Sequence, residues 1–157
     1  MEKTNAMRIL DRAKAAYTVH SYEGTGALSG KEVAAALGQD PACTFKTLVT
    51  VGAPRKYYVF VIPVAAELDL KKCAAAAGEK SVELIPQKEL FPLTGYVHGG
   101  CSPLGMKKQF PTFFHESVRG LDTVMFSAGK IGLQIEMKFS DLEKVIPVKT
   151  AYLIREE

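Results

Sequence analysis

Two neighbouring segments rich in β-branched and aromatic residues constrain the fold of this chain most strongly. Phe45–Val51 and Lys56–Ile62 are separated only by Gly52-Ala53-Pro54-Arg55. Segments of this composition favour strands, and a short connection that contains glycine joins two strands as a hairpin. The sequence therefore predicts a pair of strands near the centre of a sheet.

Residues that cap helix ends predict four helices. Serine, threonine, asparagine and aspartate satisfy free N–H groups at the start of a helix, and glycine adopts the left-handed conformation that often ends one. The predicted helices run from Thr4 or Asn5 to about Ala16, from the capping box Ser29-Gly30-Lys31-Glu32 to Gly38, from Asp69 to Gly78, and onward from a second capping box, Ser140-Asp141-Leu142-Glu143.

Further short strands alternate with these helices. Because several strand pairs are joined by connections too short for a crossover helix, the sheet should be mixed. The expected fold is α/β (α+β), with a mixed, curved, barrel-like sheet flanked by helices. The remaining strands are expected at Val19–Tyr22, Val82–Ile85, within Thr94–Gly105, and at Pro111–His115, Thr123–Phe126 and Leu133–Met137, with a helical turn at Pro86–Leu90.

Size and composition indicate one domain over residues 1–157, with 47% hydrophobic residues and a net charge of +3. No apolar run is long enough for a membrane span and the N-terminus is polar, so a cytoplasmic protein is expected. Cys43, Cys73 and Cys101 form no C-x-x-C pair, and no second close pair accompanies His98 and Cys101. Neither a disulfide framework nor a metal site is predicted, and no cofactor is expected.

Lys46 is the first candidate functional residue. Strand alternation places it on the same face as Leu48 and Thr50, which makes that face partly apolar. A lysine in this position can lie along an edge strand with its ammonium in water. Alternatively, it can contact a phosphate or a developing oxyanion in a cleft.

Two glycine-bearing segments are the second candidate feature. Gly99–Gly105 can bring backbone N–H groups close to a ligand, or it can be a plain turn. It is not a nucleotide-binding P-loop, because Met106 stands where lysine should follow Gly105. Ser127–Gly132 is typical of a hairpin turn. A Cys or Ser nucleophile with a histidine base is chemically feasible, but spacing alone assigns none.

Five segments in order along nearly the whole chain resemble the YbaK/EbsC family. They are Lys3-Thr4-Asn5-Ala6-Met7-Arg8-Ile9-Leu10-Asp11, Phe45-Lys46-Thr47-Leu48, Leu68-Asp69-Leu70-Lys71-Lys72, Gly95-Tyr96-x-x-Gly99-Gly100-Cys101-Ser102-Pro103-Leu104-Gly105 and Ser127-Ala128-Gly129-Lys130-x-Gly132. The resemblance implies the fold of that family, which is related to the editing domain of prolyl-tRNA synthetase. It also implies an aminoacyl-tRNA deacylase that removes wrongly attached amino acids, notably cysteine from proline tRNA.

The resemblance also implies roles for individual residues. Lys46 matches a lysine that holds the 3′-terminal adenosine and the aminoacyl ester, and Gly100 matches a loop glycine whose backbone faces the substrate. These two are the predicted catalytic residues. The predicted substrate-binding residues are Tyr22, Ser29, Thr47, Gly99, Cys101, Ser102, Pro103, Ser127, Gly129 and Gln134.

The chemistry implied by the family needs no protein nucleophile, because the thiol of the attached cysteine can attack its own ester and leave as a thiolactone. Attack by water is the alternative. Ser29 and Gln134 differ from the phenylalanine and aspartate that are typical of cysteinyl-tRNA deacylases. The expected partners are the 3′ end of aminoacyl-tRNA and a synthetase such as prolyl-tRNA synthetase. A non-catalytic module that binds tRNA ends or a synthetase is the competing hypothesis.

Overall fold

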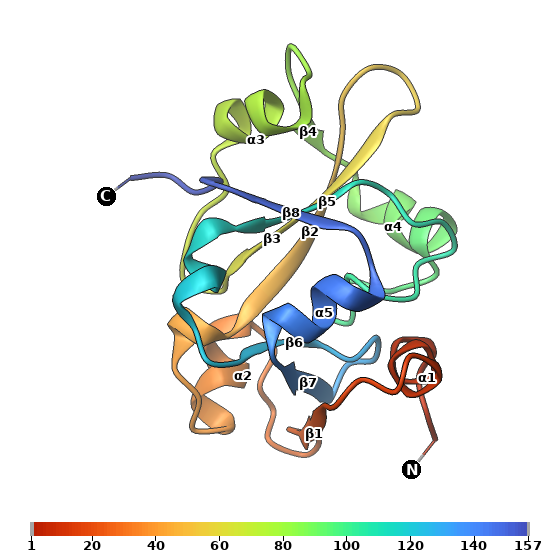
Figure 1. Ribbon diagram of the computed structural model, residues 1–157, viewed down its shortest axis with the longest axis vertical. Coiled ribbons are helices and arrows are strands. Elements are labelled where there is room, and N and C mark those ends of the chain that lie inside the picture. Colours follow the sequence, from red (N-terminus) through yellow and green to blue (C-terminus); the bar gives the residue numbers. More distant parts are fainter. Residues whose placement is uncertain (1, 157) are drawn as a thin grey trace.

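The computed structural model describes residues 2–156, which form two β-sheets with helices around them (Figure 1). The elements are α1 (Asn5–Arg12), β1 (Thr18–Ser21), α2 (Gly30–Ala36), η1 (Pro41–Cys43), β2 (Phe45–Val51), β3 (Tyr57–Pro63), α3 (Leu70–Ala77), β4 (Glu83–Leu84), α4 (Gln87–Thr94), β5 (Thr112–His115), η2 (Glu116–Gly120), β6 (Val124–Ser127), β7 (Leu133–Met137), α5 (Phe139–Val145) and β8 (Val148–Ala151).

The larger sheet has five strands in the order β4-β2-β3-β5-β8. β2 and β3 form the predicted hairpin and pair antiparallel from Phe45↔Pro63 to Val51↔Tyr57. β3–β5 and β5–β8 pair in parallel, so the expectation of a mixed sheet is confirmed. Two central strands of this sheet were thus predictable from local composition.

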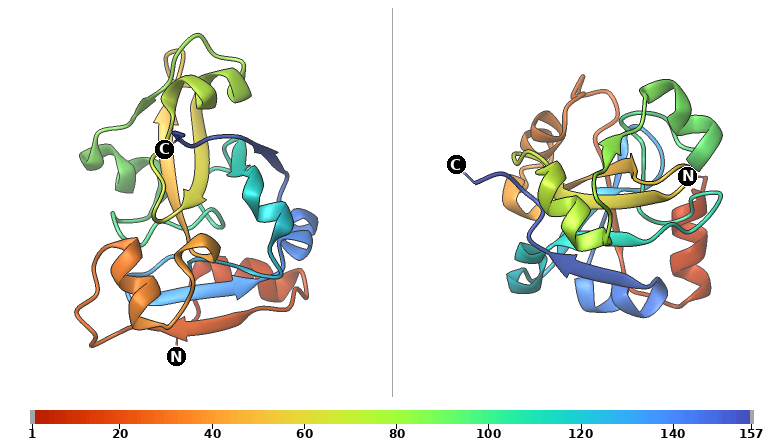
Figure 2. Two further views of the ribbon diagram at one scale, coloured as in Figure 1. Left: turned by 90° about the vertical axis from the view of Figure 1, so that its left-hand side faces the viewer. Right: turned by 90° about the horizontal axis from the view of Figure 1, so that it is seen from above.

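The smaller sheet contains β1, β7 and β6 in that order, all antiparallel. Its strands run across the direction of the β2–β3 hairpin (left view of Figure 2). A parallel bridge between Thr44 and Met125 links the start of β2 to β6. The barrel-like arrangement therefore consists of two linked sheets that do not close into one barrel.

The five-stranded sheet is buried on both faces by two different apolar clusters. Val59 and Val61 of β3 belong to the larger cluster, which is shared with α1, α5 and the small sheet. The alternate residues Phe60 and Ile62 belong to the second cluster, which is shared with α3. Burial on both faces explains why β3 is a continuous apolar run without polar alternation.

Three of the predicted helix caps are present. Thr4 Oγ1 accepts a hydrogen bond from Met7 N, and Asp69 Oδ1 accepts one from Lys72 N. Ser29 and Glu32 form the full capping box at the start of α2. α1 ends at Arg12 and not near Ala16, because the backbone leaves the helix at Lys14, where φ is 58°.

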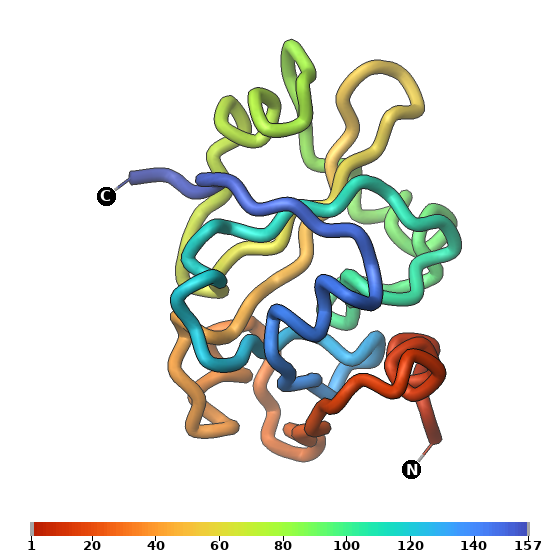
Figure 3. The backbone as a smooth tube through the Cα atoms, viewed as in Figure 1, coloured from red at the N-terminus to blue at the C-terminus, as the bar shows by residue number. Residues whose placement is uncertain are grey.

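Other elements differ from the prediction. The second capping box does not form: α5 begins at Phe139, and its N-cap, Lys138, makes no side-chain hydrogen bond. The helical turn at Pro86–Leu90 extends into α4 despite Pro92, and no strand follows it before β5 (Figure 3). β8 was not predicted.

No helix within residues 2–156 is long and apolar enough to span a bilayer.

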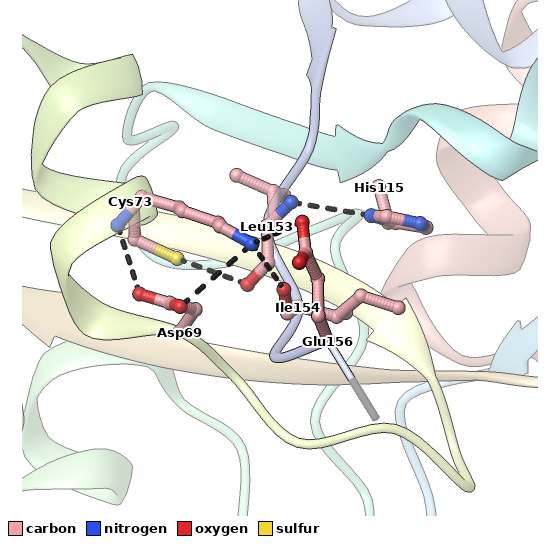
Figure 4. Close-up of polar contacts among 7 residues, drawn as sticks. Asp69, Cys73, His115, Leu153, Ile154 and Glu156 are labelled. Carbon is pink, nitrogen blue, oxygen red and sulfur yellow. Dashed lines mark hydrogen bonds and ion pairs between the residues drawn. The ribbon is translucent and has the colours of Figure 1, made fainter.

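The C-terminal segment is held against α3 and β5 by a cluster of polar contacts (Figure 4). Leu153 N donates to His115 Nδ1 at 3.2 Å, and Leu153 O accepts from Asp69 N at 2.8 Å. Lys72 Nζ donates to the carbonyl of Ile154 at 3.3 Å. The buried imidazole of His115 is therefore an acceptor, which requires its neutral form.

Burial lowers the pKa of His115 from its ordinary value, with Glu116 opposing the shift and Lys72 adding to it. A lowered pKa in the folded state means that this group contributes stability above the unfolded-state pKa of about 6.5. That stability is lost as the pH falls through the folded-state pKa. We therefore predict a smaller loss of Tm between pH 7.5 and pH 5.5 in His115→Asn, whose amide oxygen can accept from Leu153 without titrating.

Thermal unfolding across this pH range tests the prediction. His98→Asn is the matched control, because His98 is exposed and should leave the pH dependence as in the unmodified protein. Parallel Tm curves for the unmodified protein and His115→Asn would contradict the assignment.

Candidate active site

The edge of β2 is open at the end that contains Lys46. β4 pairs only with Thr50 and Val51, which lie at the far end of the strand. No described strand covers the edge from Phe45 to Leu48. Beside this open edge lies a cleft of about 240 Å³, which places Lys46 at a cavity and not on a flat surface.

Eight of the twelve predicted site residues line this cleft. They come from the connection between β1 and α2, from β2, from the glycine-rich segment before β5, and from β6 and β7. Ser127 of β6 and Gln134 of β7 are direct cross-strand partners, which is why they lie side by side. The eight are Tyr22, Ser29, Lys46, Thr47, Gly99, Cys101, Ser127 and Gln134.

Lys46 is half-buried and forms no ion pair with any residue of the described chain. Burial lowers its pKa from the ordinary lysine value; Glu67 opposes this effect and Lys31 adds to it. A partly desolvated ammonium without a fixed carboxylate partner interacts strongly with an incoming anion. Of the two alternatives for this lysine, the structure supports a cation in a cleft.

Two buried oxygens in the cleft lack hydrogen-bond partners among the described residues. They are Thr47 Oγ1 and Gln134 Oε1, and they are the only such side-chain atoms found between residues 2 and 156. Leaving a buried polar group unpaired costs about 1–3 kcal/mol. Both residues line the same cavity, so a ligand with suitable hydrogen-bonding groups could satisfy both oxygens at one place.

The other four predicted residues, Gly100, Ser102, Pro103 and Gly129, do not line the cleft. Gly100 packs against the 127–132 loop: a Cβ at this position would lie 3.0 Å from Ile131 N. Ser102 is fully buried, and its Oγ accepts from Leu104 N at 3.2 Å. Pro103 is buried beside it, and Gly129 N donates to Ser127 Oγ at 3.1 Å. These residues hold the walls of the cleft in place.

Cys101 lines the cleft, but it is a poor candidate for a nucleophile. Burial raises the pKa of its thiol to about 12, so the thiolate is scarce at neutral pH. His98 also lines the cleft and is exposed. Within residues 2–156, no three His, Cys, Asp or Glu side chains come together as a group that could hold a metal ion.

Several lining residues were not predicted from the sequence. Thr44, Phe45 and Leu48 lie near Lys46, Leu28 and Gly30 flank Ser29, and His98 precedes Gly99, so these residues could have been inferred from their neighbours in the sequence. Val33, Val64 and Leu90 carry no such local signal. The residues missed are Leu28, Gly30, Val33, Thr44, Phe45, Leu48, Val64, Leu90 and His98.

Comparison with known proteins agrees with this fold. The sequence profile of the aminoacyl-tRNA editing domain matches residues 26–145, and the chain belongs to that family. A relative with 47% identity over 137 residues is EbsC of Enterococcus faecalis (strain ATCC 700802 / V583), a protein named as a Cys-tRNA(Pro)/Cys-tRNA(Cys) deacylase. The match covers 87% of this chain and 84% of that protein.

Solved structures share the fold at lower identity. One is described as a trans-editing enzyme for prolyl-tRNA synthetase; it has a TM-score of 0.85 and 23% identity, with 99% of this chain and 100% of that chain covered. Another, the protein APE2540, has a TM-score of 0.88 and 20% identity, with 97% and 100% covered. At these identities the likeness establishes the fold.

The contact between the two glycine-bearing loops generates a prediction. Gly100→Ala would place a Cβ 3.0 Å from Ile131 N and 3.2 Å from Lys130 C, and these backbone atoms can shift only with the loop. We expect a loss of about 1–3 kcal/mol in the free energy of unfolding. Urea denaturation measures it, with Gly120→Ala as the control, because nothing lies within 4 Å of a Cβ there. Equal stability of the two variants would contradict the packing of these loops.

Proposed function

We propose that this chain is a trans-editing aminoacyl-tRNA deacylase that releases cysteine from mischarged tRNA such as Cys-tRNA(Pro). The observation that carries the proposal is a small cleft lined by half-buried Lys46 and by Thr47 and Gln134, each of which has a buried oxygen without a hydrogen-bond partner among the described residues. Membership of the editing-domain family and 47% identity to EbsC support the same activity.

Lys46 is proposed to hold the anionic part of the substrate. Lys46 lines the cleft beside the open edge of β2, so its ammonium can meet the terminal phosphate of the RNA or the oxyanion that forms on the ester. Gly99 lines the cleft and is exposed, so its backbone can approach the ribose without a side chain in the way. Both groups orient and stabilise the ester.

We propose that the nucleophile belongs to the substrate. The thiolate of the attached cysteine adds to its own ester carbonyl and forms a C–S bond, and the carbonyl oxygen becomes an oxyanion. Collapse of this intermediate breaks the bond to the ribose oxygen, which takes up the proton lost by the thiol, and a thiolactone leaves. The scarcity of Cys101 thiolate at neutral pH favours this route over attack by a protein thiol.

Gln134 is proposed to select the amino acid. Its unpaired Oε1 can accept a hydrogen bond from the α-amino group, and the cleft volume of about 240 Å³ favours a small side chain such as that of cysteine. A neutral amide attracts an ammonium less strongly than a carboxylate does, so discrimination here depends on fit and hydrogen bonding.

A synthetase such as prolyl-tRNA synthetase is a proposed partner that presents the tRNA, and the cytoplasm is the proposed compartment. The net charge of +3 on 157 residues favours assistance in RNA binding over an extended RNA interface of its own.

Deacylation of a panel of aminoacyl-tRNAs tests the activity. We expect cysteine to be released from Cys-tRNA(Pro), and we expect Lys46→Ala to lower kcat on the order of 100-fold, because it removes charge stabilisation of the oxyanion. Lys149→Ala is the matched control, since Lys149 is exposed on β8 at the far edge of the sheet. Persistent esters across the panel, or full activity of Lys46→Ala, would refute the proposal.

Mass spectrometry of the products distinguishes the two chemical routes in the same experiment. Thiolactone among the products would establish cyclisation. Free cysteine with ¹⁸O in its carboxylate would establish attack by water only where added thiolactone survives the same incubation, because hydrolysis of a thiolactone incorporates the same label. Tight binding of the tRNA without loss of the ester would instead identify a binding module.

Gln134→Leu is expected to raise KM for Cys-tRNA about tenfold, because a hydrogen bond to the substrate is lost. The same substitution removes an unpaired buried oxygen, so the free energy of unfolding should not decrease. Steady-state kinetics measures the change in KM, and urea denaturation measures the change in the free energy of unfolding. An unchanged KM would show that Gln134 does not contact the aminoacyl group.

A further inference from the structure

Exposed apolar side chains gather around the mouth of the cleft. Of the seven large hydrophobic side chains exposed among residues 2–156, four belong to segments that reach it. Leu28 lines the cleft itself, and Phe91 and Val97 directly adjoin the lining residues Leu90 and His98. The fourth, Ile131, packs beside Gly99. The mouth therefore continues into an apolar surface that no part of the described chain covers.

One side of this surface combines an aromatic ring with cations. The ring of Phe91 on α4 is 57% exposed, and Lys107 Nζ lies 5.7 Å from its centroid. Lys107 is fixed there, since its Nζ donates to Pro92 O at 3.1 Å and its backbone N donates to Thr94 O at 3.0 Å. Lys108 follows in the chain, and Lys88 lies one helical turn before Phe91; both are exposed.

The charged residues of this region are mostly lysines. From Leu90 to His115 the chain contains no aspartate or glutamate, although it includes Lys107 and Lys108. Glu89 is the sole carboxylate on α4. A region of this composition attracts a polyanion, and it lies on the side of the molecule away from the C-terminus (Figure 1).

We infer that Phe91 and the lysines at 88, 107 and 108 form a docking surface for the single-stranded 3′ end of an RNA whose terminus enters the cleft. This inference rests on the proposed function and locates the RNA outside the cleft. A base stacks on the open face of Phe91, and the lysines contact the flanking phosphates. Leu90 and Phe91 are consecutive on α4, so the helix is shared by the docking surface and the cleft wall.

A protein partner fits this surface less well than RNA does. The cores of protein interfaces are depleted of charged residues, whereas Lys107 lies over Phe91 here and the exposed Lys88 and Lys108 are its near neighbours along the chain. An aromatic ring with cations beside it is the usual platform for single-stranded nucleic acid.

Binding of a fluorescent single-stranded RNA that ends in CCA tests the surface without requiring turnover. We expect Phe91→Ala and Phe91→Leu to weaken binding about tenfold, and Phe91→Trp to preserve it, because only tryptophan can replace the stacking ring. The double variant Lys107→Ala/Lys108→Ala should lower the slope of log Kd against log salt concentration by the amount that about one phosphate contact or more contributes. Lys149→Ala, on the far edge of the sheet, should match the unmodified protein, and Tm values confirm that each variant folds.

Deacylation of two substrates separates this inference from the proposed function. Phe91→Ala should raise KM for aminoacyl-tRNA about tenfold and leave the turnover of a 2′(3′)-O-aminoacyl adenosine unchanged, since that ester has no flanking nucleotides. Normal deacylation with RNA binding unaffected by all Phe91 and lysine variants would overturn the docking surface alone. Phe91-dependent RNA binding without any deacylation would overturn the proposed function alone. Retained RNA binding with lost prolyl-tRNA synthetase binding would assign the surface to a protein and also overturn this inference.

Discussion

The antiparallel ladder between β2 and β3 is the constraint on which the rest of the structure depends. Phe45 and Val49 belong to one apolar cluster, whereas Phe60 and Ile62 of the partner strand belong to the other. A slip of one residue would exchange these two faces, so the register is strongly specified. Lys46 pairs with Ile62 in this register, which places the lysine beyond the covered part of the strand edge. The position of the candidate catalytic cation thus follows from this register together with the short length of β4.

The second sheet completes the site because it is linked to the start of β2. The bridge between Thr44 and Met125 brings β6 beside the residues that precede Lys46. β6 ends at Ser127, and pairing with β7 sets Gln134 directly opposite. Glycine at position 100 then lets the segment before β5 approach the 127–132 loop more closely than a side chain would permit. Each wall of the cleft is held by contacts that are distant in sequence.

Local patterns predicted the parts of the fold that depend on local physics. The capping box at Ser29 and the cap at Asp69 need only neighbouring residues, and both form. The similar pattern at Ser140 fails because Phe139 is drawn into the core, where its ring lies 5.1 Å from that of Phe114, so the helix starts earlier. β8 was missed because its pairing with β5 is parallel and non-local, and its four residues show no alternation of burial.

The same distinction applies to the site. Strand alternation could assign Lys46 to a face, but it could not decide between solvent and a cleft, because that depends on how much of β2 the short strand β4 covers. The family resemblance brought together eight residues that do line the cleft, yet it also assigned a catalytic role to Gly100 and substrate-binding roles to Ser102, Pro103 and Gly129, which do not line it. Their conformations and contacts support the walls, and only three-dimensional packing separates the two groups.

The unpaired oxygens of Thr47 and Gln134 carry a free-energy cost of burial without a hydrogen bond. Among the described residues, no other buried side-chain nitrogen or oxygen lacks a partner. In general, leaving a buried polar group unpaired costs about 1–3 kcal/mol. A buried polar atom that is unpaired in the protein but faces a cavity can recover this free energy when a ligand supplies the partner. Because burial raises the pKa of Cys101 to about 12, its thiolate is scarce at neutral pH, which agrees with the proposed role of the cleft in orienting and stabilising the ester. An orienting site of this kind needs rigid walls, and the packed loops provide them.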